Sequence, residues 1–380
     1  MRLSQLPGRL WAFARNNVVL SVAVAAALLT SLAVPPDRRW LDYFDWKTLA
    51  CLFSVLAVVN ALRGILFFTM LAHGIVRCFR SVRACVLALC CITFVGSMFI
   101  ANDMALLTFL PLGYFVLSST GNSRLLAYTF IMQNLSANLG GMLTPFGNPQ
   151  NLYLYTRYAL GNLEFMSIML LPFVVSVALI VVCCLLVRGE PVRLGSTPVP
   201  RHPWRACAYL ALFALSVVMV FRCVPYQVGT LVIVVALLFL DRSALRKVDY
   251  PLLLTFVAFF VFSGNLSRLE PVRELFGRLL DHGTLVFSVL SCQVISNVPT
   301  AILLSQFTDN YRELLVGVNI GGAGTLVASL ASLITFREYG RLHPEGIRGY
   351  LVLFAALNAL FLGVLLAVML WWFRLHPATA

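Results

Sequence analysis

Long apolar segments with few charges dominate the chain. Each is close to the roughly 20 residues that a helix needs to cross the hydrocarbon core of a bilayer. The apolar and polar residues do not alternate as they do along the strands of a membrane β-barrel. We therefore predict an all-α, polytopic membrane protein with about nine transmembrane helices. The nine segments are 17–34, 46–61, 125–158, 166–187, 206–222, 224–240, 250–266, 314–336 and 349–373.

Two further apolar stretches differ because each has a polar tip near its middle. Residues 84–118 contain Ala101-Asn102-Asp103, and residues 284–307 contain Ser296-Asn297-Val298-Pro299. We predict that each forms a re-entrant hairpin of two short helices, which enters the membrane and returns to the same side. Charged, amphipathic stretches that precede the hairpins predict interfacial helices. They cover 62–82 and 267–281.

Composition and charge support this assignment. Hydrophobic residues make up 60% of the 380 residues and charged residues 11%, against about 25% charged in soluble domains. Net charge is +13, which we assign to loop sidedness and not to nucleic-acid binding. With the N-terminus in the cytoplasm, 18 of the 28 Lys and Arg residues fall on the cytoplasmic side. We expect a bacterial inner-membrane protein whose C-terminus lies outside.

Metal, disulfide and enzymatic chemistry find little support in the sequence. Most of the ten Cys lie in apolar segments without a CxxC pair, and the five His lie near predicted helix ends without an HxxxH pair. We expect no metal site and no cofactor other than Na⁺ as a coupling ion. An intramembrane enzyme needs a nucleophile and base or paired acids at depth. The sequence offers one acid there, Asp103, so we predict that the chain is not an enzyme.

The two halves of the chain repeat each other. Asn138-Leu-Gly-Gly-Met-Leu-Thr144 matches Asn319-Ile-Gly-Gly-Ala-Gly-Thr325 at an offset of 181, and Asn102 matches Asn297 at an offset of 195. One extra helix between two even-span units inverts the second unit, as in many secondary transporters. We predict three regions. They are an N-terminal repeat (1–187), a cytoplasmic loop with a linker helix (188–223) and a C-terminal repeat (224–380).

Both repeats contain a segment that predicts a broken helix, within 125–158 and 314–336. Such backbone is tolerated at membrane depth where it lines a cavity or is buried in protein. Asn148 followed by Pro149 is a good start for a half-helix, whose N-terminus attracts anions, while unwound carbonyls bind cations. Close helix packing is the other explanation for the glycines. The polar residues around the two breaks are Thr144, Asn148, Gln150, Asn151, Thr325, Ser329 and Ser332.

The hairpin tips carry the remaining candidate chemistry. Asn102 and Asn297 can each cap the second helix of their hairpin, which is compatible with ligand contact. Asp103 is either an acid favoured by the helix dipole or a site that couples transport to a cation or proton. Ser296 and Thr300 either line a pathway or serve helix packing.

These motifs resemble the ion transporter superfamily, which includes divalent anion:sodium symporters, citrate carriers, ArsB-type arsenite permeases and sodium/proton antiporters. The closest branch is that of citrate-transporter-like anion permeases. The resemblance implies hairpins from opposite faces, a midplane site, a homodimer and elevator-type movement. In the symporters each tip reads Ser-Asn-Thr and contacts a substrate carboxylate. Here both Asn match and neither Thr does. Asp103 replaces one Thr, which disfavours a dianion and is closer to the permease and antiporter branches.

We expect a secondary transporter that moves an anion or small oxyacid, coupled to Na⁺ or H⁺. The alternative is a cation/proton antiporter of the same fold that binds its cation at Asp103. The expected substrate-binding residues are Asn102, Asp103, Thr144, Asn148, Asn151, Ser296, Asn297, Thr300 and Thr325. The expected ion-coupling residues are Asn102, Asp103, Gly147, Asn148, Asn151, Asn297, Thr325 and Ser329. The candidates at the two hairpin tips follow from the sequence pattern. The sodium contacts of the ion-coupling residues other than Asp103 are what the resemblance implies.

Overall fold

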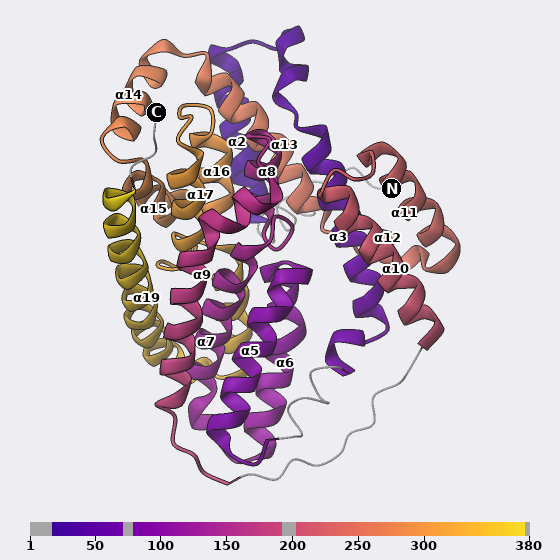
Figure 1. Cartoon of the computed structure of the whole chain (residues 1–380), viewed down its shortest axis with the longest axis vertical. Helices are drawn as coiled ribbons and strands as arrows, with labels where there is room; N and C mark the ends of the chain where they lie inside the picture. Colours follow the sequence, from indigo (N-terminus) through magenta and orange to yellow (C-terminus); the bar gives the residue numbers. More distant parts are fainter. Residues whose placement is uncertain (1–16, 71–78, 192–202, 377–380) are drawn as a thin grey trace, which may run out of the picture.

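Helices account for 82% of the structure, a computed structural model that describes residues 17–70, 79–191 and 203–376. Among these residues there is no β-strand, apart from an isolated bridge between Ser81 and Pro191. The helices of the first half are α2 (Val18–Ala33), α3 (Trp46–Gly64), α5 (Val82–Ile100), α6 (Asn102–Ser119), α7 (Leu126–Gly140), α8 (Pro149–Arg157) and α9 (Asn162–Leu185) (Figure 1). The prediction of an all-α membrane protein is confirmed.

The second half follows a similar order after a linker helix. Its helices are α10 (Pro203–Val220), α11 (Tyr226–Leu240), α12 (Arg242–Arg246), α13 (Tyr250–Ser267), α14 (Glu270–Asp281), α15 (Thr284–Ile295), α16 (Asn297–Leu304), α17 (Tyr311–Ile320), α18 (Leu330–Leu342) and α19 (Ile347–Leu375).

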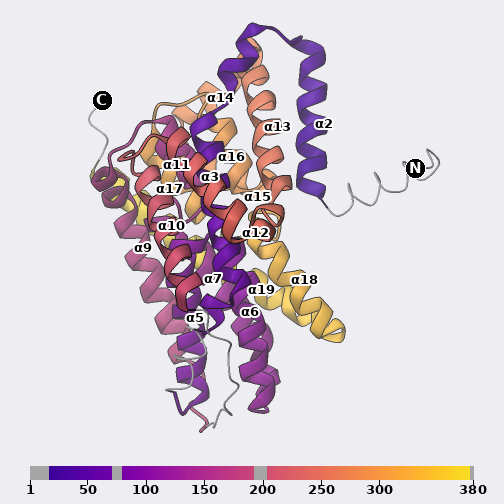
Figure 2. The same cartoon turned by 90° about the vertical axis from the view of Figure 1, so that its right-hand side faces the viewer.

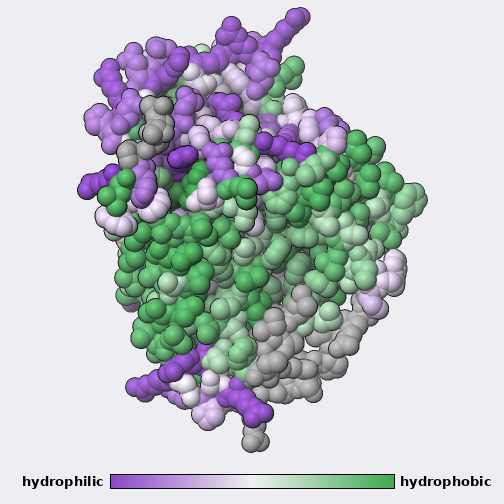
Figure 3. Space-filling view, viewed as in Figure 1, coloured by the Kyte–Doolittle hydropathy of each residue, from purple (hydrophilic) through white to green (hydrophobic). Residues whose placement is uncertain are grey.

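Six helical segments of the described chain are long and apolar enough to cross a membrane: α3, α5, α9, α10, α13 and residues 344–375. Helices α2, α11 and α15 are apolar but shorter. The face of the molecule in Figure 3 carries a broad apolar band between two polar ends, as a bilayer-embedded protein requires. The chain is therefore a multi-pass membrane protein, while the number of nine crossings stays a prediction.

A pair of helices joined by a turn stands at each predicted hairpin, and the two pairs point in opposite directions, while their re-entry into the membrane stays a prediction. Helices α5 and α6 descend to one end of the molecule, whereas α15 and α16 extend toward the other (Figures 1 and 2). The helices α5 and α6 of the first hairpin have 19 and 18 residues, whereas α15 and α16 of the second have 12 and 8. The prediction of short helices is wrong for the first hairpin, because at 1.5 Å per residue its limbs are about 28 Å long.

Both predicted broken helices are also present. Helix α7 ends at Gly140 and α8 begins at Pro149, while α17 ends at Ile320 and α18 begins at Leu330. The amphipathic stretch 267–281 forms α14. The stretch 62–82 is not one interfacial helix, because α3 continues through its first residues to Gly64, and residues 71–78 lie outside the described part of the chain.

The helices form two packed groups. In one group α2 packs against α13, and α3 packs against α10 and α11. In the other α5 packs against α6, α7 and α9, α18 packs against α6 and α7, and α19 packs against α7 and α9. The first hairpin and α7 lie in this second group (Figure 2), whereas α16 of the second hairpin packs against α13 of the first group and against α8.

An ion pair fastens the loop after α2 to the end of α13. The Arg268 Nη2 lies 2.8 Å from Asp37 Oδ2, and this hydrogen bond lowers the pKa of the Asp37 carboxyl below its usual value. A carboxyl with a lowered pKa stabilises the fold at neutral pH, and this contribution is lost as the pH falls through its folded pKa.

We expect Asp37→Asn to lower the melting temperature by a few degrees at most near pH 6, because exposed ion pairs contribute little. The difference should shrink as the pH falls through the lowered pKa of the wild-type carboxyl, because the variant has no charge to lose there. Thermal melts over a falling pH series in the same detergent would check this. A difference that stays constant down to the most acidic pH would contradict an electrostatic origin.

Candidate functional site

The tips of the two hairpins share one backbone conformation. Ala101 has φ 60° and ψ 151°, and Ser296 has φ 75° and ψ 158°. Residues other than glycine rarely adopt this region, at a cost of about 1–3 kcal/mol. The strain is therefore built twice at equivalent points, which is typical of a functional turn.

The tip asparagines do not occupy the predicted cap positions. Asn102 and Asn297 are the first residues of α6 and α16, and the N-cap residues are Ala101 and Ser296. Each asparagine Oδ1 accepts a hydrogen bond from the next backbone N–H, at 2.9 Å in both hairpins. The prediction is wrong by one residue because the positive-φ turn already ends at the preceding residue.

Each broken helix is tied to its hairpin by a threonine. Thr144 donates its hydroxyl to the Met98 carbonyl at 2.8 Å, and Thr325 donates to the Gln293 carbonyl at 2.9 Å. Both acceptors stand four residues before the tip asparagine. The repeat read from the sequence therefore recurs as an equivalent contact in the two halves.

Asparagines connect the two halves behind the tips. Asn102 Nδ2 donates to Asn138 Oδ1 at 3.0 Å. Asn148 Nδ2 donates to Asn319 Oδ1 at 3.4 Å, and Asn319 Nδ2 donates to Asn151 Oδ1 at 2.6 Å. All five side chains are buried. Buried amides need such partners, so these bonds fix both broken helices against each other.

The second broken helix uses smaller side chains for the same purpose. Ser329 is the N-cap of α18 and accepts a hydrogen bond from the Ser332 N–H at 3.2 Å. Asn134 of α7 donates to Ser332 Oγ at 3.2 Å. At the second tip, the Asn297 N–H donates to the Ala328 carbonyl at 2.9 Å. The start of α18 is thus bound both to α7 and to the hairpin.

Asn148 has an unsatisfied oxygen. It is the N-cap of α8 with Pro149 following, as predicted, but its side chain does not cap the helix. Its Oδ1 is buried and has no hydrogen-bond partner among the described residues. A Cβ on Gly141 would collide with this oxygen. Side-chain amide and backbone oxygens are ligands that Na⁺ and similar hard cations accept, so this position is chemically suited to a coupling ion.

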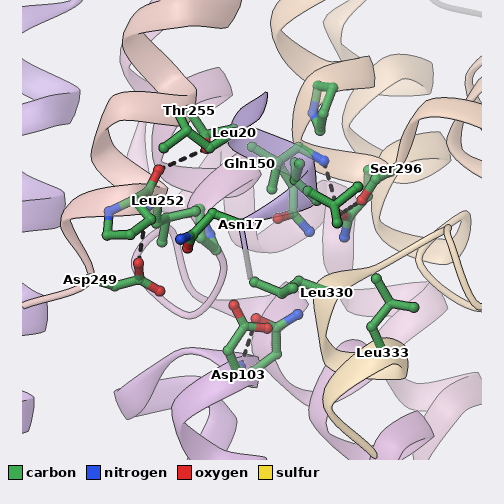
Figure 4. A pocket seen from close by; sticks show the side chains of 18 of the residues that line it. Asn17, Leu20, Asp103, Gln150, Asp249, Leu252, Thr255, Ser296, Leu330 and Leu333 are labelled. Carbon is green, nitrogen blue, oxygen red and sulfur yellow. Dashed lines mark hydrogen bonds between the residues drawn. The ribbon is translucent and has the colours of Figure 1, made fainter. Parts of the chain in front are cut away.

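A cavity of about 140 Å³ lies between the two tips and the starts of α2 and α13. Figure 4 shows Asp103 from α6, Asp249 from the start of α13 and Ser296 from the second tip around it. Other walls come from the starts of α2, α8 and α18. The lining residues are Asn17, Val18, Val19, Leu20, Asn102, Asp103, Pro149, Gln150, Asp249, Pro251, Leu252, Thr255, Ser296, Asn297, Val298, Pro299, Leu330, Leu333 and Arg337.

Three charged side chains line this cavity. Asp103 and Asp249 are half-buried, and Arg337 is exposed. Asp103 is the one acid predicted at membrane depth, and Asp249, which the sequence pattern placed in a loop, lines the same cavity. In the structure Asp249 is the N-cap of α13, and Arg337 lies within α18.

The predicted site residues divide into two sets. Asn102, Asp103, Ser296 and Asn297 line the cavity. The others do not line it. These are Thr144, Gly147, Asn148, Asn151, Thr300, Thr325 and Ser329.

Two of the threonines have local structural partners. Thr300 is buried and donates to the Ser296 carbonyl within its own helix at 2.7 Å. Thr325 is exposed, and its N–H and hydroxyl both bond to Gln293, at 2.8 and 2.9 Å. Neither side chain faces the cavity, so direct substrate contact by Thr300 and Thr325 is not supported by this arrangement.

Sequence reasoning missed several residues of the site. Asn138 and Asn319 open the repeated motif, but their side chains were not counted among the site residues. Gln150 follows Pro149 and lines the cavity, and its buried Oε1 has no partner among the described residues. A buried amide inside an apolar segment is the signal that could have identified all three.

Comparison with known proteins agrees with this architecture. The sequence profile of a family described as "Citrate transporter" matches residues 10–310. An uncharacterized transporter of Methanocaldococcus jannaschii is 32% identical over 311 residues, which cover 82% of this chain and 86% of that protein. The inner membrane protein YbiR of Escherichia coli is 28% identical over 308 residues, 79% of this chain and 82% of that protein. The chain is therefore a membrane transporter that belongs to the citrate transporter family.

Proposed function

We propose that this chain is a secondary active transporter that moves a small anion or oxyacid and couples the movement to Na⁺ or H⁺. The observation that carries the proposal is the cavity between the two hairpin tips, which Asp103, Asn102 and Asn297 line. The tip amides donate and accept hydrogen bonds. Arg337 supplies a positive charge at the same cavity.

Charge limits the class of substrate. Two carboxylates, Asp103 and Asp249, oppose one guanidinium in the cavity. Like charges at close range in a poorly hydrated space are strongly unfavourable, so a dianion is a poor ligand while both acids are ionised. A monoanion or a neutral oxyacid fits better. A dianion would require protonation of one acid or a bound cation, which is a physical route to coupling.

The coupling ion is proposed to bind behind the first tip. The buried Oδ1 of Asn148, which has no partner among the described residues, supports this. So does the position of Asn148 at the end of the turn between α7 and α8, whose backbone carbonyls are close by. Asn151 Nδ2 donates to three carbonyls of this turn, those of Gly141, Met142 and Thr144. The turn is thereby fixed in a conformation that a cation could use without reorganisation.

Movement is proposed to be of the elevator type in the inner membrane of a bacterium, with the N-terminus in the cytoplasm and the C-terminus outside. The two hairpins and the two broken helices, which repeat in the two halves of the chain, support it. The repeats 1–187 and 224–380, with the linker between them, and a homodimer are part of the same proposal. Mass measurement of the detergent-solubilised protein would test the dimer.

A cation/proton antiporter is the second candidate. The observation that favours it is that Asp103 and Asp249 line one cavity. Two carboxylates can bind a cation without any anion. The two candidates differ in which solutes bind.

A thermal-shift screen of the purified protein against Na⁺, pH and a panel of anions and oxyacids separates the two. A ligand at one hundred times its Kd stabilises the folded state by about 2.7 kcal/mol. We expect an anion or oxyacid to raise the melting temperature, and to do so more strongly with Na⁺ or at low pH. If cations alone raise it and no anion or oxyacid does, the antiporter replaces the first proposal.

A further inference from the structure

A second cavity lies far from the hairpin tips, where α7 begins and α9 ends. Its volume is about 520 Å³. Figure 1 shows these helix ends at the bottom of the molecule, beside the start of α5. The lining residues are Val82, Asn122, Arg124, Leu125, Tyr128, Cys183, Leu186, Val187, Arg188, Glu190, Leu357 and Leu360.

One wall of this cavity is apolar and open to the surface. Leu186 is 77% exposed and Leu360 is 50% exposed, and Leu357 lies one helical turn from Leu360 on α19. Helix α19 belongs to a segment long and apolar enough to span the membrane. Exposed leucines on such a helix are solvated by lipid chains, so an acyl chain can enter this side of the cavity from the bilayer.

The same cavity also carries a positive charge. Arg124 and Arg188 both line it, against one acid, Glu190. Arg124 forms an ion pair with Glu190, but its side chain remains 63% exposed. Arg188 is exposed as well, and the salt bridges among the described residues do not include it. Guanidinium groups bind phosphate oxygens in a bidentate fashion.

Hydrogen bonds fix the wall of the cavity. The Tyr128 hydroxyl of α7 donates to the Cys183 carbonyl of α9 at 2.6 Å. Arg83 of α5 donates to the Val187 carbonyl, just after α9, at 2.6 Å. The helices α5, α7 and α9 are therefore held together at the cavity, which is a preformed pocket.

We propose that this cavity binds an anionic phospholipid. Its phosphate lies between Arg124 and Arg188, and one acyl chain follows Leu186, Leu357 and Leu360. The two arginines and the lipid-facing leucines of one cavity match the two parts of such a molecule. A soluble anion would gain nothing from the leucines, and a zwitterionic lipid would gain less from the two arginines. Basic residues near anionic lipid contribute about 1 kcal/mol each.

Native mass spectrometry of the full-length chain with dioleoyl phosphatidylglycerol and dioleoyl phosphatidylcholine tests the proposal. We expect phosphatidylglycerol to be retained about tenfold more strongly, and the preference to fall to about threefold or less in the double variant Arg124→Gln/Arg188→Gln. Arg341→Gln is the matched control, because Arg341 is also paired with an acid, Glu338, and lies outside the cavity. It should retain the wild-type preference.

Two further variants make the test independent of the folding of the double variant. Glu190→Gln releases Arg124 from its ion pair and should strengthen phosphatidylglycerol binding. Leu360→Gln should weaken it without changing any charge. Equal retention of both lipids, an equal loss in Arg341→Gln or no response to Glu190→Gln would each overturn the proposal. If soluble glycerol phosphate raised the melting temperature as much as phosphatidylglycerol does, the cavity would be a simple phosphate site and not a lipid site.

Discussion

Replacement of Asp103 by Asn is expected to abolish ion-driven uptake, by about a hundredfold or more in proteoliposomes. The physical reason is that an amide of the same shape can neither bind a proton nor neutralise a cation. The backbone N–H of Asp103 holds Asn102 Oδ1, and that bond does not involve the carboxyl group. The hairpin tip should therefore keep its conformation, and the loss should concern coupling and not folding.

Binding should respond in the opposite direction to transport. Removing one negative charge from the cavity weakens repulsion of an anion, so Asp103→Asn should bind the substrate anion as well as or better than the wild-type chain. It should do so without dependence on Na⁺ or pH. Equilibrium binding measured with and without Na⁺, at two pH values, checks this directly.

Asp249→Asn is the matched control, because it removes the same charge from the same cavity but away from the tip. We expect a smaller loss of uptake and a retained ion dependence. If Asp249→Asn loses ion dependence while Asp103→Asn keeps it, the coupling group is Asp249. If neither variant loses ion dependence, the two carboxylates only contribute to the electrostatic potential of the cavity. The coupling ion would then bind at the turn between α7 and α8, which contains Asn148.

The second large effect is expected at Gly140, where α7 crosses α5. A Cβ on Gly140 would fall onto the Phe94 carbonyl oxygen of α5 and lie 2.6 Å from Ser97 Oγ. Because a backbone carbonyl within a helix cannot move alone, the helices would have to separate. Overpacking of this kind costs about 1–3 kcal/mol, and Gly140→Ala should reach or exceed the upper end.

Gly349→Ala and Gly363→Ala are the controls for this prediction. Both glycines lie within α19, and a Cβ at either would meet nothing within 4 Å. Alanine in a helix interior is favoured over glycine by about 0.5–1 kcal/mol, so these variants should melt at or above the wild-type temperature. Thermal melts in one detergent compare all three. A Gly140→Ala variant as stable as the controls would mean that α5 and α7 are not closely packed.

Several features of the fold followed from local chemistry alone. The apolar segments required membrane helices, and the polar tips near Asn102 and Asn297 required turns. The glycines and the Asn148-Pro149 pair required a break between α7 and α8. Each of these depends on residues close together in the chain, and water-free surroundings leave few ways to satisfy a backbone. The repeated threonine contact of the two halves was likewise present as repeated sequence.

The composition of the cavity depended on the tertiary structure. Asp249 and Arg337 follow loop-like charge patterns, and only the packing of α13 and α18 against the hairpins brings them to Asp103. The direction of each side chain was also undetermined, because the irregular backbone between α17 and α18 decides whether Thr325 meets Gln293 or a substrate. The sequence by itself determined where the chain must turn within a membrane, since backbone hydrogen bonding is local. Which charges share one small space was decided by contacts between distant segments, which no local pattern encodes.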